Sequence, residues 1–155
     1  MSSVFKKLNL KDQKDILVLN APDGFEPEIK SLKKIKVQRS LKDAKEVRFS
    51  LAFVTKQNEL DRIARSVTRK ALGDAIVWFA YPKKTSRNYK CEFNRDTGWA
   101  VLGEAGFEGV RMVAIDEDWS ALRFRRVEFI KTMTREKKRT MTSEGRKKAA
   151  PRQTR

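Results

Sequence analysis

Short apolar runs recur along this chain, separated by stretches whose apolar residues are spaced as in helices. Four runs, at 16–19, 49–54, 75–81 and 110–115, are apolar at nearly every position. Such runs are typical of strands in the middle of a parallel sheet, because helices cover both faces of that sheet. Residues 35–38 alternate between apolar and polar positions, which predicts a more exposed strand. The whole pattern predicts an α/β fold with a mostly parallel sheet.

The clearest helix is predicted after residue 58. Its apolar residues recur at the spacing of one helix face, and they are Leu60, Ile63, Ala64, Val67 and Ala71. Asn58 is expected to cap the start of this helix, and Gly73 to end it. Shorter helices are predicted at 27–33, which begins on a proline, and at 95–105.

The last apolar segments predict a C-terminal antiparallel β-hairpin. The linkage at 116–120 is too short for the helix that a parallel connection needs, so 110–115 and 121–129 must pair antiparallel. Its acidic residues, 116–118, are then interpreted as turn residues rather than as a metal site. In the final strand the alternation of apolar and polar residues shifts by one position after Phe124. This shift predicts a bulge or bend near Arg125 and Arg126.

Charge divides the chain into two parts. It has 155 residues and a net charge of +16, and half of that charge falls within 131–155, where ten Lys or Arg accompany two Glu. We therefore expect one folded domain over 1–130 and a basic, mostly disordered tail over 131–155. Clustered cations attract nucleic acids regardless of sequence, although the tail has no aromatic residue for base stacking. The candidates for such contact are Arg123, Arg125, Arg126, Lys137, Lys138, Arg139, Arg146, Lys147 and Lys148. The alternative is a tail that only adds solubility.

Composition excludes several kinds of chemistry. The chain has no histidine, which removes the commonest general base, the His-activated nucleophiles and the usual zinc sites. Its one cysteine, Cys91, can form neither a disulfide within the chain nor a metal-binding cluster. No apolar stretch approaches the roughly 20 residues of a membrane-spanning helix, and the start lacks the apolar core of a secretory signal. We expect a cytoplasmic protein with no metal and no membrane contact.

Candidate binding residues follow the predicted strands. In an open α/β sheet, ligands bind beyond the carboxyl ends of the strands. The residues at those ends are Asn20, Asp23 and Gly24 after the first strand, Thr55 after the third, and Tyr81, Lys83 and Lys84 after the fourth. Two ammonium groups beside a phenol and two hydroxyls would suit a small anionic ligand. The alternatives are a solvated turn at 81–86 and a plain Asp-Gly turn at 23–24.

Three segments carry a resemblance to a known family, and they are 15–25 (DILVLNAPDGF), 79–84 (FAYPKK) and 114–124 (AIDEDWSALRF). Together they resemble a bacterial family known only as a domain of unknown function, which has no established activity. The order of predicted elements over about 14–130 also resembles a reduced class I methyltransferase-like Rossmann fold, a three-layer sandwich. That resemblance implies a last strand inserted antiparallel between two others. It also implies that one helix–strand unit of the full fold is missing after Gln38.

The cofactor positions of that fold carry the wrong residues for S-adenosylmethionine. The turn at 20–25 has a proline and one glycine, where several glycines would leave backbone N–H groups close to a ligand. The segment 38–40 offers no carboxylate for ribose hydroxyls, and 55–57 lacks the Asp/Asn-Pro-Pro-aromatic pattern of amino methyltransferases. We therefore expect no cofactor.

The expected function is binding rather than catalysis. The chain is interpreted as a non-catalytic binding or regulatory domain with a degenerate cofactor site, whose partner is an unknown protein or a small anionic ligand. One alternative is a nonspecific nucleic-acid-associated protein that uses the basic tail. Another is an enzyme that acts on a small anionic substrate, or a methyltransferase that binds its cofactor in an atypical way.

Overall fold

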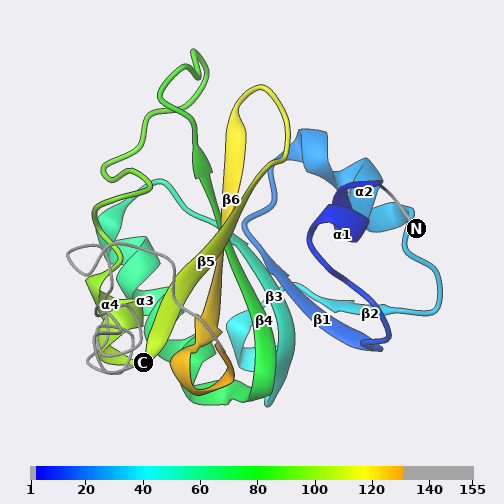
Figure 1. Ribbon diagram of the computed structural model, residues 1–155. Helices are drawn as coiled ribbons and strands as arrows, with labels where there is room; N and C mark the ends of the chain where they lie inside the picture. The colour runs from blue at the N-terminus through cyan, green and yellow to red at the C-terminus, as the bar shows by residue number, and fades with distance from the viewer. Residues whose placement is uncertain (1–2, 131–155) are drawn as a thin grey trace, which may run out of the picture.

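The computed structural model describes residues 3–130, which form a six-stranded sheet with helices on both faces (Figure 1). The strands are β1 (Asp15–Leu19), β2 (Lys36–Gln38), β3 (Val47–Phe53), β4 (Ala71–Pro82), β5 (Phe107–Ala114) and β6 (Trp119–Arg126). The helices are α1 (Ser3–Lys7), α2 (Glu26–Lys30), α3 (Gln57–Lys70) and α4 (Ala100–Glu104). Single 3-10 turns lie at Asp23–Phe25, Leu41–Asp43 and Val127–Phe129. The predicted tail, 131–155, lies outside the described residues.

The sheet has the order β2-β1-β3-β4-β6-β5. β1 pairs in parallel with β2 and β3, and β3 pairs in parallel with β4. β6 lies antiparallel between β4 and β5. The predicted α/β class, the C-terminal hairpin and the antiparallel insertion of the last strand are therefore confirmed.

The first edge of the sheet is shorter than in the full fold that the sequence resembles. β2 is the edge strand, and the connection at 39–46 from β2 to β3 contains only the 3-10 turn Leu41–Asp43. A further helix and strand have no place in this connection, as expected from the polar residues after Gln38.

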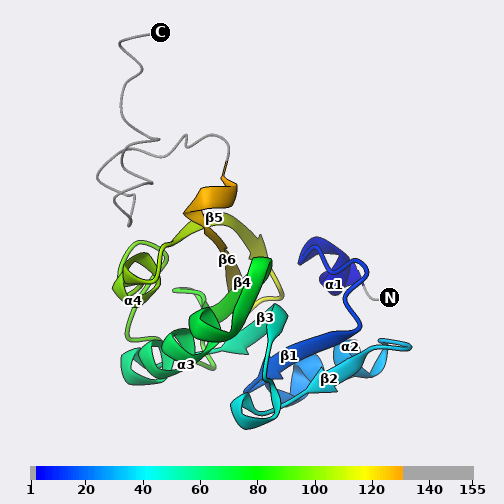
Figure 2. The same cartoon turned by 90° about the horizontal axis from the view of Figure 1, so that it is seen from below.

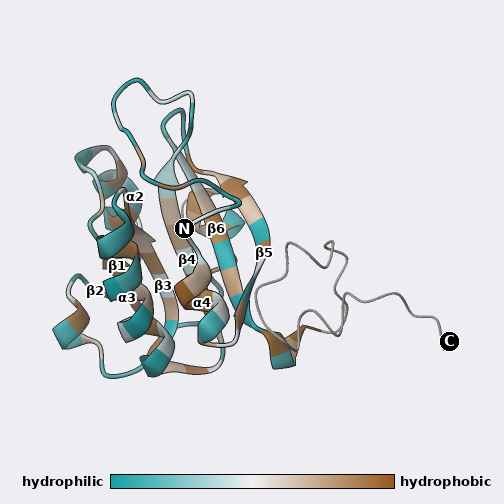
Figure 3. Cartoon of the chain, turned by 90° about the vertical axis from the view of Figure 1, so that its left-hand side faces the viewer, coloured by the Kyte–Doolittle hydropathy of each residue, from teal (hydrophilic) through white to brown (hydrophobic). Residues whose placement is uncertain are grey.

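Helices α3 and α4 cover one face of the sheet, and α1 and α2 cover the other (Figure 2). The predicted apolar stripe of α3 is buried on the first face, where Leu60, Ala64 and Val67 are fully inaccessible. Its opposite side is hydrophilic and faces solvent (Figure 3). The amphipathic pattern thus determines which side of α3 packs on the sheet.

The second face is covered by α1, a helix that the sequence did not indicate. Phe5 and Leu8 are fully buried there, and the indole N–H of Trp78 donates to the Leu8 carbonyl at 2.8 Å. A helix of five residues is too short to show a repeating apolar pattern. Its position depends on contacts with residues far along the chain.

The bounds of two predicted helices are corrected. α3 begins at Gln57 and ends at Lys70, so Asn58 is not its cap, and Gly73 lies within β4 with a φ of +53°. The helix predicted at 95–105 is reduced to α4, because the backbone N–H groups of Asp96 and Thr97 bond to the Asn94 side chain instead. This local turn competes with the helix, as Asn side chains commonly do.

The predicted bulge is also in a different place. Gly109 lies opposite Phe124 and Arg111 opposite Arg123, so the extra residue is Val110 of β5. β6 continues without a bulge to Arg126. The alternation of apolar and polar residues shifts because the chain then enters the 3-10 turn Val127–Phe129. None of the helices described within 3–130 is long and apolar enough to cross a membrane.

Candidate functional site

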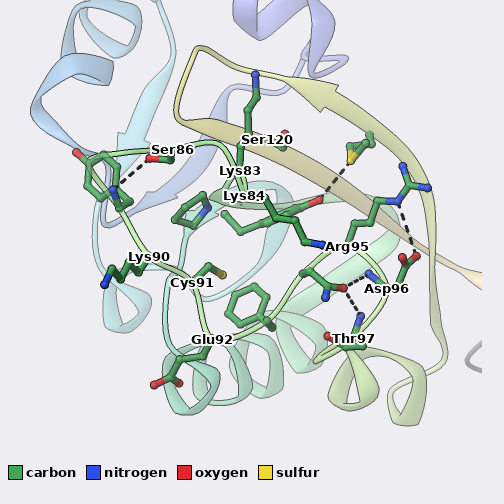
Figure 4. A pocket seen from close by; sticks show the side chains of 16 residues that line it. Lys83, Lys84, Ser86, Lys90, Cys91, Glu92, Arg95, Asp96, Thr97 and Ser120 are labelled. Atoms are coloured by element: carbon green, nitrogen blue, oxygen red, sulfur yellow. Dashed lines mark hydrogen bonds and ion pairs between the residues drawn. The ribbon is translucent and has the colours of Figure 1, made fainter.

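A cavity of about 810 Å³ opens at the carboxyl end of β4 (Figure 4). Its walls come from the end of β4, the long loop at 83–99, Met112 of β5 and Ser120 of β6. The loop and the turn between β5 and β6 stand at the same end of the sheet (Figure 1). This is the end of an α/β sheet at which ligands bind.

Aromatic side chains form the base of this cavity. Tyr81 and Phe93 line it, with ring centroids 6.2 Å apart, and both rings pack against Trp99, at 5.6 and 5.2 Å. The Tyr81 hydroxyl donates to the sulfur of Met112 at 3.3 Å. Burial raises the pKa of Tyr81 to about 12, so the phenol is neutral at physiological pH. The base of the cavity is therefore apolar and uncharged.

The first part of the loop is held by Asp118, in the turn between β5 and β6. Its carbonyl accepts the Lys83 N–H at 2.7 Å, and its carboxylate accepts the hydroxyl of Ser86 at 2.8 Å and the amide of Asn88 at 3.2 Å. The carboxylate of Asp116 accepts the N–H groups of Asp118 and Trp119 within the turn. These acidic residues thus shape the turn, as the sequence predicted, and no metal-binding cluster of three His, Cys, Asp or Glu occurs in 3–130.

The second part of the loop is tied to the start of α3. The Glu92 carboxylate accepts the N–H of Gln57 at 2.8 Å, and the Glu92 N–H donates to the Thr55 carbonyl at 3.0 Å. The Gln57 side chain in turn donates to the Gly98 carbonyl at 2.8 Å. The loop is therefore anchored at both ends, which preforms the cavity.

Four cations line the cavity, and they are Lys83, Lys84, Lys90 and Arg95. Of its two carboxylates, Glu92 is bonded to α3, and Asp96 lies 3.8 Å from the guanidinium of Arg95. Lys84 and Lys90 form no ion pair with another residue of 3–130. Lys83 and Lys84 leave the strand end in different directions (Figure 4). The site carries net positive charge above an apolar base.

Cys91 also lines the cavity, beside Lys90. Burial is the main cause that raises the pKa of its thiol. A thiol with a raised pKa is a poor nucleophile, because the thiolate is the reactive form. Cys91 therefore acts here as a small wall residue.

At the end of β1, the cofactor position of the resembling fold, Asn20 is bonded to two neighbouring elements. Asn20 has a φ of +58°, and its amide donates to the Phe53 carbonyl at 3.3 Å and to the Glu59 carboxylate at 3.4 Å. The same carboxylate accepts the N–H of Thr55 at 3.1 Å. Asn20 and Thr55 thus belong to a link between β1, β3 and α3, and neither lines the cavity.

The residues after Asn20 do not fit an adenosyl cofactor. Phe25 is buried, with its ring centroid 5.0 Å from that of Phe53 and 5.6 Å from that of Phe5. An aromatic side chain thus packs beside the connection from β1 to α2. At the end of β2 stands Arg39, which is bonded to Glu26 and lowers the pKa of that carboxyl. At the cofactor position of the fold, the turn at 20–25 thus has one glycine and a proline, and the end of β2 carries Arg39 where a carboxylate commonly binds ribose.

Solved structures share this architecture. The chain is similar to a SAM dependent methyltransferase from Aquifex aeolicus, with a TM-score of 0.55 and 15% identity over 79% of this chain and 87% of that one. It is also similar to magnesium protoporphyrin IX methyltransferase (ChlM) from Synechocystis PCC 6803 with bound SAM, with a TM-score of 0.51 and 10% identity over 79% of this chain and 74% of that one. The pyocyanin biosynthetic protein PhzM aligns with a TM-score of 0.52 and 10% identity, over 80% of this chain and 54% of that one.

No protein-family model matches the chain, and no curated protein matches it in sequence. The structural likeness therefore establishes the fold alone. The chain has a Rossmann-like methyltransferase fold, with a six-stranded sheet whose β4-β6-β5 part is antiparallel.

The structure brings together some of the sequence-predicted site residues and separates others. Tyr81, Lys83 and Lys84 line the cavity, whereas Asp23 and Gly24 are exposed and lie outside its lining. Sequence reasoning missed Lys90 and Arg95. They follow the strand end by several residues, and only the folding back of the loop brings them to the cavity.

Two of the arginines predicted to contact nucleic acid hold the start of β4. Arg125 donates twice to the carboxylate of Asp74, at 2.8 and 2.6 Å. Arg126 donates to the carbonyls of Gly73 and Ala71 and lies over the ring of Phe107, 5.3 Å from its centroid. The candidates of the tail, from Lys137 to Lys148, lie outside the described residues, and their contact with nucleic acid stays a prediction.

Proposed function

We propose that this chain is a binding protein for a small anionic ligand, held in the cavity at the carboxyl end of β4. The observation that carries the proposal is the difference between the carboxyl ends of β4 and β1. Four cations line an open cavity at β4, whereas at the end of β1 Asn20 is bonded to Glu59 and Phe25 packs against Phe53. A regulatory role by ligand binding is consistent with this difference.

The lining indicates the chemistry of the ligand. Lys84, Lys90 and Arg95 suit a carboxylate, sulfonate or phosphate group, because charge-assisted hydrogen bonds to such groups are the strong ones. Tyr81 and Phe93 offer aromatic surface below. We therefore propose an anion with a flat apolar body, and the volume of about 810 Å³ suits such a molecule.

Fluorescence titration with anilinonaphthalene sulfonate, an aromatic anion, tests the proposal. The double variant Lys84→Met/Arg95→Met should raise its dissociation constant about tenfold or more, because two charge-assisted contacts are lost. The matched control is Lys42→Met/Arg48→Met, which removes the same charge from exposed positions at the amino end of β3. Equal weakening by both double variants would contradict a cavity site and indicate nonspecific attraction.

A second candidate function is nonspecific nucleic-acid binding, and the charge of 131–155 favours it. We propose that this stretch attracts the phosphate backbone by counterion release. Binding to duplex DNA should weaken steeply as salt is added, and deletion of 131–155 should abolish it. Duplex binding that survives the deletion would assign the contact to residues 1–130 instead.

A further inference from the structure

Arginines face one another on the side of the β5–β6 hairpin opposite the cavity. Arg123 of β6 lies directly opposite Arg111 of β5, and Trp78 of β4 lies on its other side. Opposing residues of antiparallel strands share a face, with Cβ atoms roughly 5 Å apart. Met112, which lines the cavity, alternates with Arg111 and so belongs to the other face.

Arg123 has no hydrogen-bond partner among residues 3–130. Its Nε is buried without one, and its other N–H groups make no hydrogen bond or ion pair with the described residues. The side chain as a whole is only partly exposed. Burial first, and then the Arg125 cation, lower the pKa of Arg123. An unpaired, half-buried cation beside like charges is costly to hold, so a counter-charge at this position would stabilise the fold.

No carboxylate described within 3–130 forms an ion pair with Arg123, although the charge of Asp74 opposes part of the lowering of its pKa. Asp74 is engaged by Arg125 through two hydrogen bonds. Glu108 is fully buried opposite Arg125, and it already takes part in an interaction. Arg111 is exposed and likewise has no ion pair with a described residue. Neither the Arg111 nor the Arg123 guanidinium thus has an ion-pair partner among the described residues.

We propose that Arg111 and Arg123 together bind one phosphoryl group. Each guanidinium offers parallel N–H groups that match the oxygens of a phosphate. Because the Nε of Arg123 is buried, the terminal nitrogens of that side chain make the contact. The site takes a single group, since Arg125 is already committed to Asp74. It lies on the face of the sheet away from the cavity and does not depend on the function proposed above.

An NMR titration of the arginine Nε–Hε signals of the full chain tests this site. Inorganic phosphate is added at constant ionic strength, with chloride as the reference salt, and the Arg123 signal is assigned by its loss in Arg123→Lys. The Arg123 signal should shift saturably with phosphate in the wild type and in the cavity variant Lys84→Met/Arg95→Met. Arg111→Met should raise the dissociation constant about tenfold or more. The absence of a phosphate-specific shift, or a shift that Arg111→Met leaves unchanged, would overturn the proposal.

Thermal unfolding with and without phosphate adds a second readout. Phosphate should raise the Tm of the wild type and not that of Arg123→Met, whereas Arg125→Met should lower the Tm equally in both conditions, because it breaks the bond to Asp74. Equal loss of Tm for Arg123→Met with and without phosphate would assign Arg123 a purely structural role. Repeating the titration with methyl phosphate identifies the source, since a tighter fit than inorganic phosphate indicates a phosphomonoester.

Discussion

At the scale of single residues, Tyr81 shows most clearly how burial sets chemistry in the cavity. Its ring packs against those of Phe93 and Trp99, and its hydroxyl has the sulfur of Met112 as acceptor. Burial is the main cause that raises its pKa to about 12, and the nearby Arg95 cation opposes this shift only in part. The residue therefore offers a ligand an apolar surface and a neutral hydroxyl, and it does not act as a base.

The raised pKa of Tyr81 predicts a pH dependence of stability. The unfolded chain releases this proton near pH 10, whereas the folded chain keeps it until about pH 12. The stabilisation is fully present below about pH 10 and is lost as pH rises through about 12, because the folded state then binds more protons than the unfolded one. Urea unfolding across this range should show a steeper fall in the free energy of unfolding for the wild type than for Tyr81→Phe. Parallel curves would contradict the assignment.

The same scale shows which site residues a sequence can identify. Tyr81, Lys83 and Lys84 were predicted because they follow directly after an apolar strand, where ligand sites occur. Asn20 and Thr55 occupy equivalent positions, yet both are bonded to Glu59. That contact joins residues on three separate elements, so no local sequence pattern predicts it.

At the scale of elements, the loop at 83–99 is the part that makes the cavity. Gly98 holds its end against α3, with a φ of +94° that favours glycine. A Cβ at this position would lie 2.6 Å from the Cβ of Phe93 and 2.8 Å from the side-chain oxygen of Gln57. Gly98 therefore lies where the loop, the cavity wall and the start of α3 meet, and the residue at this position must be small.

Two glycine substitutions test this role of the loop. Gly98→Ala should lower the free energy of unfolding by at least about 2 kcal/mol and weaken anilinonaphthalene sulfonate binding, because both the φ and the contacts are unfavourable. Gly24→Ala is the matched control, since its added Cβ meets nothing within 4 Å, and its effect should stay within about 0.5 kcal/mol. Denaturant unfolding of both variants gives the comparison. Similar effects of the two substitutions would show that the loop does not depend on Gly98.

The helices and strands that could be predicted are those whose own residues determine their structure. The apolar strands at 16–19 and 75–81 and the amphipathic α3 were indicated by composition and periodicity. The helix predicted at 95–105 is shorter than predicted and spans Ala100–Glu104, because the Asn94 side chain captures backbone N–H groups at its expected start. The bulge was placed in the wrong strand, because the register of β6 depends on its partner β5.

At the scale of the whole molecule, the two halves of the sheet differ at their carboxyl ends. In the β2-β1-β3 half Asn20 is bonded to Glu59 and Phe25 packs against Phe53, whereas the β4-β6-β5 half carries the cavity. The chain thus has the fold of methyltransferase structures, while its cavity lies apart from the turn at 20–25. The fold alone would suggest a cofactor position that the side chains do not support.

Amide NMR of the full chain during titration with S-adenosylhomocysteine, followed by anilinonaphthalene sulfonate, tests this division most directly. The sulfonate should shift the amides of 83–97 in a saturable manner, and the adenosyl compound should leave the amides of 20–25 unchanged. Saturable shifts at 20–25 on addition of S-adenosylhomocysteine would contradict the account, because they would show an adenosyl site at the end of β1.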